Sequence, residues 1–428
     1  MNCGSPAAIE DFLSNIVQKA SIQLRVFARV GDDDPCAALT LMRLCGHRSA
    51  LTFFMRAMGP TPCLAQIDAI LPEVLMPLTG PLTTLAATSQ VALAPSGGGF
   101  GLPPLTVLAP IAHCASWSAS MKLFPLILAS VAPISLLSSP ALAPFPKVTA
   151  AMADIFSSAV DNDEATPGRR LQKTLTALFQ TSLAESLFSA GSREDKARFQ
   201  SLRAKTASLW MCPVPATCQE KIWMSPDNFR ATCRLRLGLP VADVEVRCAA
   251  CAANSKTSTQ DVLGYHAICC MAGGDRTHTH NNLLKQLFAD ASFGLMHPVW
   301  EVHPFGDNQR MDFVIRNGEA EQLVDLALTF PLQKNSVAAA VTTPGGAATQ
   351  YEAIKRKKYE RFLSRGQTLV PLVFDTFGAA GASARPLLDR IAGAFSRRFG
   401  SRIGRTIFFT RINVVLLSQV AAIIVGHT

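Results

Sequence analysis

A group of cysteine and histidine residues near the middle of the chain constrains its folding most strongly. Cys248 and Cys251 have the Cys-x-x-Cys spacing, and His266 and Cys270 follow, four residues apart. Residues four apart can share one face of a helix, and three thiolates with one imidazole form a complete tetrahedral ligand set for Zn²⁺. A closed set favours a structural site over a catalytic one. The sequence therefore predicts a structural zinc site that joins these four residues.

Several alternatives to this ligand set stay open. Cys269 competes with Cys270 as the fourth ligand, and His278 or His280 follows closely enough to donate instead. The cysteines could also be reduced core thiols, with His266 hydrogen-bonded. The N-terminus has no basic segment followed by an apolar run, which argues against a cleaved secretory signal. Because thiols inside the cell stay reduced, metal binding is favoured over disulfides, and we expect an intracellular location.

Composition narrows the classes of protein to consider. The chain has 428 residues, of which 49% are hydrophobic and 17% charged, so general disorder is excluded. A formal net charge of +9 favours a polyanionic partner, either nucleic acid or an acidic membrane face. The apolar stretches Met121–Val148 and Ile407–Val425 are interrupted by proline or polar residues, and neither is a clean spanning segment. We expect no membrane partner, although a membrane-associated helical protein is a third, weaker interpretation.

The part of the chain before the cysteines divides into two regions. Residues 1–195 are predicted to be mostly helical, with helix-like apolar content in Leu51–Met58 and Ala65–Leu78. Residues 196–247 form a basic connector in which aromatic residues are interleaved, as on nucleic-acid surfaces. A solvated helix face over a small core explains that pattern equally well. The candidate nucleic-acid ligands are Lys221, Arg230, Arg234, Arg236 and His280.

After the cluster, which we place at residues 248–280, the pattern changes from helical to mixed. We expect a helix at 281–292, strands at 299–303, 311–315 and 323–330, a helix at 350–363, a strand at 368–374 and a helix at 385–399. Asn317-Gly318, between the second and third strands, is a strong hairpin signal. The order α-β-β-β-α-β predicts an α/β domain over residues 281–405, followed by an apolar tail at 406–428.

Two aspartates lie inside the apolar strands of this hairpin. An ionised Asp312 or Asp325 is costly in an apolar strand unless it is paired or binds a metal. On paired strands both can point to one face and share Mg²⁺, which would lower the pKa of its water and stabilise charge on a phosphate. Lys355 and Lys358 are three residues apart, so both can face the sheet near that phosphate. Glu301 is a candidate third carboxylate.

A purely structural interpretation of the same residues also stays open. Asp312 and Asp325 could pair with Arg310 or a lysine only to hold the fold together. The lysines at 355–358 could form a solvated helix face or an import signal.

The order of these motifs resembles that of a known family. The matching residues are Gly264-Tyr265-His266-Ala267, Cys270, His280-Asn281, Met311-Asp312, Val324-Asp325-Leu326-Ala327-Leu328-Thr329, Glu352, Lys355, Lys358-Tyr359, Val370-Pro371-Leu372-Val373 and Thr376-Phe377-Gly378. This run resembles the C-terminal zinc knuckle and restriction-like endonuclease domain of non-LTR retrotransposon polyproteins, a nuclease of the PD-(D/E)XK class. Residues 1–195 resemble the thumb and connector that follow the reverse-transcriptase palm.

The chain departs from the family pattern at a few positions. Met311 stands where the family has proline, and Thr279 where it has arginine before His-Asn. Ala327, two residues after Asp325, replaces the lysine of the class motif, and a lysine from the following helix can reach the same place. No reverse-transcriptase active site is expected, because Gly31-Asp32-Asp33-Asp34 lacks flanking apolar strands.

The resemblance implies a metal-dependent DNA endonuclease that nicks target DNA for retroelement insertion. It implies structural Zn²⁺ at Cys248, Cys251, His266 and Cys270, and catalytic Mg²⁺ or Mn²⁺ at Asp312 and Asp325. The expected partners are DNA and element RNA, and the expected location is the nucleus. The alternative is a catalytically inactive, nucleic-acid-binding retroelement remnant with an intact zinc knuckle.

Overall fold

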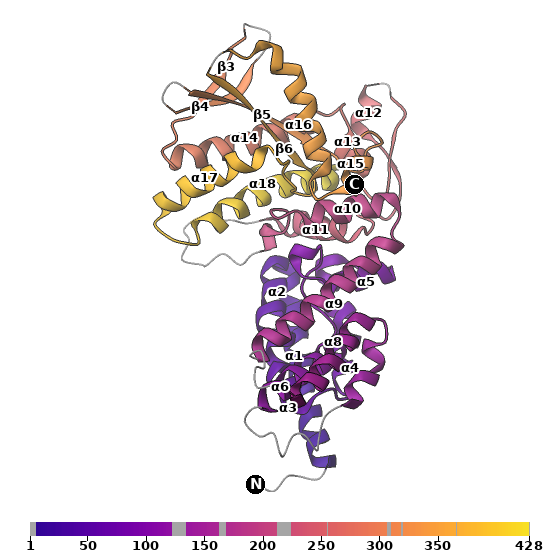
Figure 1. Ribbon diagram of the computed structural model, residues 1–428. Coiled ribbons are helices and arrows are strands. Elements are labelled where there is room, and N and C mark those ends of the chain that lie inside the picture. Colours follow the sequence, from indigo (N-terminus) through magenta and orange to yellow (C-terminus); the bar gives the residue numbers. More distant parts are fainter. Residues whose placement is uncertain are drawn as a thin grey trace. The chain divides into compact units, whose positions relative to one another are not determined.

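The computed structural model describes residues 6–121, 134–161, 168–211, 224–254, 256–305, 310–317, 320–364 and 366–427 (Figure 1). The chain divides into two compact units, Met1–Ala190 and Gly191–Thr428. Most described residues are helical, and the second unit also contains a small mixed sheet. This composition of elements is consistent with the expected α/β class.

The first unit is built from helices over the residues described. They are α1 (Pro6–Asp33), α2 (Pro35–Leu41), a π-helix (Met42–Gly46), α3 (Arg48–Met58), α4 (Leu64–Thr79), α5 (Leu85–Val91), α6 (Leu105–Met121), α8 (Pro146–Asp161) and α9 (Gly168–Ala190), with short 3₁₀ turns at Pro95–Gly97, Ile134–Ser138 and Pro140–Leu142. The two helices expected from apolar content, 51–58 and 65–78, are confirmed as α3 and α4.

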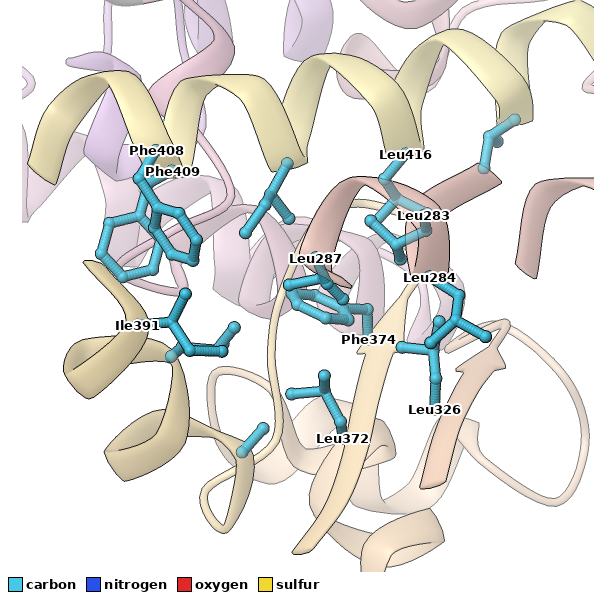
Figure 2. Packing of buried hydrophobic residues seen from close by; sticks show 14 of the residues in the cluster. Leu283, Leu284, Leu287, Leu326, Leu372, Phe374, Ile391, Phe408, Phe409 and Leu416 are labelled. Carbon is cyan, nitrogen blue, oxygen red and sulfur yellow. The ribbon is translucent and has the colours of Figure 1, made fainter. Parts of the chain in front are cut away.

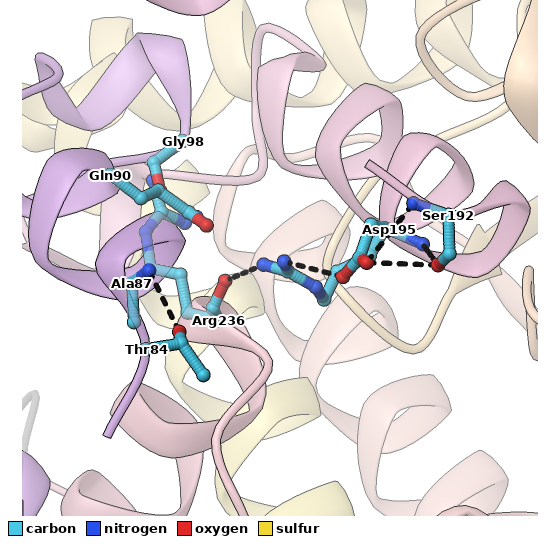
Figure 3. A network of polar contacts seen from close by, with 8 residues as sticks. Thr84, Ala87, Gln90, Gly98, Ser192, Asp195 and Arg236 are labelled. Carbon is cyan, nitrogen blue, oxygen red and sulfur yellow. Dashed lines mark hydrogen bonds and ion pairs between the residues drawn. The ribbon is translucent and has the colours of Figure 1, made fainter. Parts of the chain in front are cut away.

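Local hydrogen bonds shape the segment around α5. Thr84 begins this helix, and its hydroxyl accepts a hydrogen bond from the Ala87 amide at 3.1 Å (Figure 3). The Gln90 side chain donates to the Gly98 carbonyl at 2.8 Å. A Cβ at Gly99 would lie 2.2 Å from the carbonyl oxygen of Gln90, so only glycine fits there. This glycine-rich segment is therefore a close-packed turn.

The second unit carries the sheet and the cysteine cluster. Its elements are α10 (Arg193–Arg203), a 3₁₀ turn (Leu209–Met211), α11 (Pro226–Leu237), β1 (Val246–Arg247), α12 (Ala249–Ala253), β2 (Thr259–Gln260), α13 (Tyr265–Cys269), α14 (Asp275–Phe293), β3 (Val299–Val302), β4 (Met311–Asn317), β5 (Ala320–Thr329), α15 (Val337–Thr342), α16 (Gly346–Tyr359), a 3₁₀ turn (Glu360–Phe362), β6 (Gln367–Asp375), α17 (Ala384–Phe399) and α18 (Gly404–His427). From α14 to β6 the expected order α-β-β-β-α-β is confirmed, with the short helix α15 added.

The four-stranded sheet has the order β3-β4-β5-β6. The β3–β4 and β4–β5 pairs are antiparallel, and β5–β6 is parallel. β4 and β5 pair as far as Asn317 and Ala320, which is the register of a two-residue hairpin. The two residues between them, 318 and 319, lie outside the described part of the chain. The parallel pair needs a crossover connection, which α15 and α16 provide.

Helices cover both faces of this sheet. On one face, α14 and α17 pack against alternate strand residues, and α18 packs on these two helices (Figure 2). The labelled core residues of that face are Leu283, Leu284, Leu287, Leu326, Leu372, Phe374, Ile391, Phe408, Phe409 and Leu416. On the other face, Ala348 of α16 packs against Ala327 of β5 and Val373 of β6. Because strand residues alternate between faces, a residue next to a core position points to the opposite helix layer.

The expected apolar tail at 406–428 is described as far as His427; it forms most of α18 and contributes to this core. Among the described helices, α18 is long and apolar enough over Gly404–Gly426 to cross a membrane, and 72% of its most apolar window is buried within the protein. Its polar residues bind neighbours in the protein. Arg411 contacts Asp290 at 3.2 Å, and Gln419 accepts a hydrogen bond from Asn282 at 3.1 Å. The other apolar stretch, 121–148, lies partly outside the described residues.

Three of the four domain borders expected from sequence fall inside helices, whereas the border after residue 247 coincides with the end of β1. The borders after residues 195, 280 and 405 fall inside α10, α14 and α18 respectively. The sequence motifs end at these positions, whereas the helices continue across them. α14 in particular joins the cysteine cluster and the sheet through one continuous helix.

Candidate functional site

The four expected zinc ligands converge in the structure. The ligand atoms of Cys248, Cys251, His266 and Cys270 all lie within 4.8 Å of one another. The Cys251 sulfur lies 3.6 Å from that of Cys270 and 3.5 Å from His266 Nε2, and the Cys248 and Cys270 sulfurs are 3.8 Å apart. Thiolates bound about 2.3 Å from a tetrahedral zinc are about 3.8 Å apart. This Cys₃His cluster could therefore hold a metal ion such as zinc.

Short local elements build the cluster. β1 pairs with β2, and the Cys248 amide donates to the Ser258 carbonyl, which brings the chain back on itself. Cys248 also caps α12, where its sulfur accepts a hydrogen bond from the Cys251 amide. The Asp261 carboxylate accepts hydrogen bonds from the amides at the start of α13, including that of His266 at 2.7 Å. These bonds orient α13 so that His266 and Cys270 meet the Cys-x-x-Cys pair.

The structure shows which of the alternative ligands belong to the cluster. The Cys269 sulfur lies 3.1 Å from Gln333 Nε2, outside the cluster, so Cys270 is the fourth member. His278 Nε2 lies 2.9 Å from the Asn282 side chain. His280 faces the sheet, as described below.

The two strand aspartates lie side by side. The antiparallel register of β4 and β5 ends at the Phe313–Val324 pair, and Asp312 and Asp325 are the next residues on the two strands. The two carboxylates are near enough to interact, because, besides burial, the charge of Asp312 raises the pKa of Asp325. Both aspartates are 7% exposed. The hairpin therefore gathers two buried carboxylates at one point on the sheet.

Asp312 is held by groups from two other elements. Its Oδ2 accepts a hydrogen bond from the Leu326 amide at 2.6 Å and lies 3.4 Å from His280 Nε2. Burial tends to lower the pKa of His280, but the hydrogen bond to Asp312 and the charge of Asp312 raise it above the ordinary value. The structure places His280 against the carboxylate, and its expected contact with nucleic acid stays a prediction.

Asp325 is paired with a lysine from α16. Lys355 Nζ lies 2.8 Å from Asp325 Oδ2, and the two side chains are 17% and 9% exposed. Burial raises the pKa of Asp325 and the nearby Asp312 raises it further, against the opposing effect of Lys355. For Lys355, burial lowers the pKa, but Asp325 raises it above the ordinary value, so the ammonium group stays charged. The crowding of two carboxylates is what a bound cation would relieve.

The other predicted residues lie further from this pair. Lys358 is exposed, and its ammonium group contacts the Tyr359 hydroxyl at 3.1 Å. Glu301 of β3 lies between Trp300 and Val302, which pair with Phe313 and Met311 of β4, and its φ is 45°. Its Oε1 lies 3.2 Å from Arg310, and both side chains are about half exposed. Arg310 thus pairs with Glu301 and not with either aspartate, and a catalytic role for Glu301 stays a prediction.

The basic connector has one member whose position argues against its expected role. Arg236 is 2% exposed, so its side chain is not available to a phosphate backbone. Its carbonyl accepts a hydrogen bond from Arg198, which also contacts Asp195 at 3.1 Å (Figure 3). The apolar spacing of α11 buries this position, which the count of basic residues could not reveal. Arg230 contacts Asp227 at 3.2 Å with 30% of its side chain exposed.

Arg234 is partly buried, and Lys221 lies outside the described residues. Comparison with known proteins adds no further constraint: no protein-family model matches the chain, and no curated protein matches it.

Proposed function

We propose that this protein is a metal-dependent DNA endonuclease of the kind found in non-LTR retrotransposon polyproteins. The observation that carries the proposal is the Lys355–Asp325 ion pair on a mixed sheet, with Asp312 near enough to raise the pKa of Asp325 beyond the effect of burial. Two carboxylates and one lysine, supplied by two paired strands and the crossover helix, form the set of groups that a PD-(D/E)XK nuclease uses. The wider motif order supports the same class.

The residues fit a hard divalent cation. Asp312 and Asp325 would supply carboxylate oxygens, and Mg²⁺ takes one or two carboxylates and completes its shell with water and phosphate. A bound cation would lower the pKa of its water and stabilise negative charge on the phosphate. Lys355, charged and partly buried, would neutralise the phosphate or orient the attacking water. Ala327 leaves the usual place of the class lysine vacant, and Lys355 reaches Asp325 from the helix instead.

The Cys₃His cluster has a structural role in this proposal. Its four ligands leave no open position for a substrate or a reactive water, as in structural zinc sites. A metal bound there would hold the short elements before α14, which have little apolar core of their own.

The second candidate is a nucleic-acid-binding remnant without catalysis. Glu301 favours it, since this carboxylate pairs with Arg310 and does not complete the acidic group. The Lys355–Asp325 ion pair would in that case be a structural contact between α16 and β5.

Cleavage of supercoiled plasmid tests the proposal. The wild-type protein should convert plasmid to open circles with Mg²⁺ or Mn²⁺, and EDTA should stop the reaction. Asp325→Ala, purified and assayed in parallel, should not cut. Cleavage that survives both EDTA and this substitution would overturn the proposal.

A further inference from the structure

We propose that His280 is a positioning residue that orients the Asp312 carboxylate for a divalent cation. The inference rests on the proposed function and adds to it a residue that acts through Asp312. It is based on the contacts of the His280 imidazole with Asp312 of β4 and Leu326 of β5.

The two groups beside His280 Nε2 both accept hydrogen bonds. They are the Leu326 carbonyl at 3.2 Å and Asp312 Oδ2 at 3.4 Å. Nε2 therefore carries a proton, and the ring is shared between the backbone of β5 and the carboxylate of β4. The Leu326 amide donates to the same Asp312 oxygen at 2.6 Å. Oδ2 is thus held by two donors, which leaves Oδ1 to face a cation.

The helix that carries His280 is firmly anchored on the sheet. Leu283, Leu284 and Leu287, on the following turns of α14, are buried in the core of the second unit (Figure 2). Before His280, the Arg276 side chain donates to the Leu328 carbonyl of β5 at 3.3 Å. The imidazole therefore has little freedom to leave Asp312.

The cysteine cluster lies just before α14, and α13, which carries His266 of the cluster, contacts the residues that follow β5. The Tyr265 and Phe330 rings are 5.4 Å apart, and Gln333 contacts the Cys269 sulfur. Both contacts join the residues after β5 to α13, next to the cluster. Because α14 begins shortly after Cys270 and carries His280, it connects the proposed structural metal site to His280.

Loss of the imidazole should weaken the cation site without removing a ligand. Residues that hydrogen-bond to metal ligands typically contribute 10–100-fold in metal affinity. His280→Ala should therefore raise the dissociation constant for Mn²⁺ about 10-fold or more. His280→Gln keeps an N–H donor at a similar distance and should restore most of the affinity.

Mn²⁺ binding measured by electron paramagnetic resonance, on zinc-loaded full-length protein without DNA, tests this inference independently of cleavage. Wild type, His280→Ala, His280→Gln and Asp325→Ala are compared. His278→Ala serves as the matched control, because His278 lies on the same helix and contacts Asn282 instead. Thermal unfolding of each variant separates a loss of affinity from a loss of fold.

The expected result is weaker binding in His280→Ala, recovery in His280→Gln, and no change in His278→Ala. Wild-type affinity in His280→Ala, with binding abolished by Asp325→Ala, would overturn the positioning role and leave the proposed nuclease standing. If His280→Ala is unfolded, His280→Gln decides: wild-type-like affinity supports the role, and weak affinity in a folded protein overturns it. No Mn²⁺ binding by the wild type would overturn the proposed function itself.

Discussion

Lys355 Nζ lies 2.8 Å from Asp325 Oδ2, which connects the crossover helix α16 to the middle of strand β5. Both groups are mostly buried, so the contact is much less screened by solvent than a surface ion pair. Besides burial, the charge of the nearby Asp312 raises the pKa of the same carboxylate. The ion pair with Asp325 distinguishes Lys355 from Lys358, whose ammonium group contacts the Tyr359 hydroxyl.

The two lysines should therefore behave differently when each is replaced by alanine. Lys355→Ala should lower the single-turnover cleavage rate by about 10²-fold or more, because it removes a charge beside the reacting phosphate. Lys358→Ala, its matched control, should cost only affinity for DNA, through one lost phosphate contact. Cleavage and binding are measured on the same DNA duplex. Greater loss of cleavage in Lys358→Ala than in Lys355→Ala would contradict this assignment.

The cysteine cluster makes a prediction about metal content. Purified protein should carry about one zinc ion per chain, measured by mass spectrometry of the metal. Cys251→Ser should lose it, since it removes one of four ligands, whereas Cys269→Ser should keep it because that sulfur faces Gln333. Chelation should lower the thermal stability of the second unit. Zinc retained in Cys251→Ser, or absent from the wild type, would refute the site.

Binding to DNA should depend steeply on salt, because lysine and arginine side chains release counterions from phosphates. Arg230→Glu and Arg234→Glu should each weaken binding to every sequence and reduce the salt slope by about 1. Arg236→Ala should instead lower the unfolding temperature, since this side chain is 2% exposed. Fluorescence anisotropy at several salt concentrations gives the slopes, and a flat response would exclude a phosphate-binding surface.

A buried aspartate away from the site makes stability depend on pH. Burial raises the pKa of Asp375 from 3.8 to about 6, although its carboxylate accepts hydrogen bonds from the Phe377 and Ala379 amides. The folded protein then binds more protons than the unfolded chain between these values, so stability falls as pH rises through this window. In Asp375→Asn this loss should disappear.

The size of this effect follows from the pKa. Each pKa unit corresponds to about 1.36 kcal/mol. Between pH about 3.5 and about 7, the free energy of unfolding of Asp375→Asn should therefore rise relative to that of the wild type by up to about 3 kcal/mol. Urea unfolding at a series of pH values measures the difference. Parallel pH profiles for the two proteins would mean that the Asp375 proton is not held more tightly in the fold.

Much of the second unit is predictable from sequence because its signals are local. Alternating apolar residues, the Asn317-Gly318 pair and the apolar spacing of α14 depend only on neighbours along the chain, and the strands lie within a few residues of their expected ends. The spacing of Cys248, Cys251, His266 and Cys270 similarly predicts the cluster that forms.

The details that remained open depend on tertiary packing. Lys355 and Lys358 share one helix face by spacing, and only the packing of α16 on β5 places one of them on Asp325. The sequence does not distinguish Arg236 from the exposed basic residues, because its burial depends on how α11 packs. His280 meets Asp312 across 32 positions of sequence, through a contact between helix and strand that no local pattern encodes.

The most direct test of the account is plasmid cleavage by the wild type, Asp312→Ala and Asp325→Ala, with DNA binding measured on the same samples. We predict metal-dependent nicking by the wild type and none by either variant. Both variants should bind DNA as tightly as the wild type, or more tightly, because each lacks a carboxylate that repels phosphate. A wild-type protein that holds zinc and binds DNA, yet never cuts with any divalent metal, would contradict the account and identify the chain as a binding remnant.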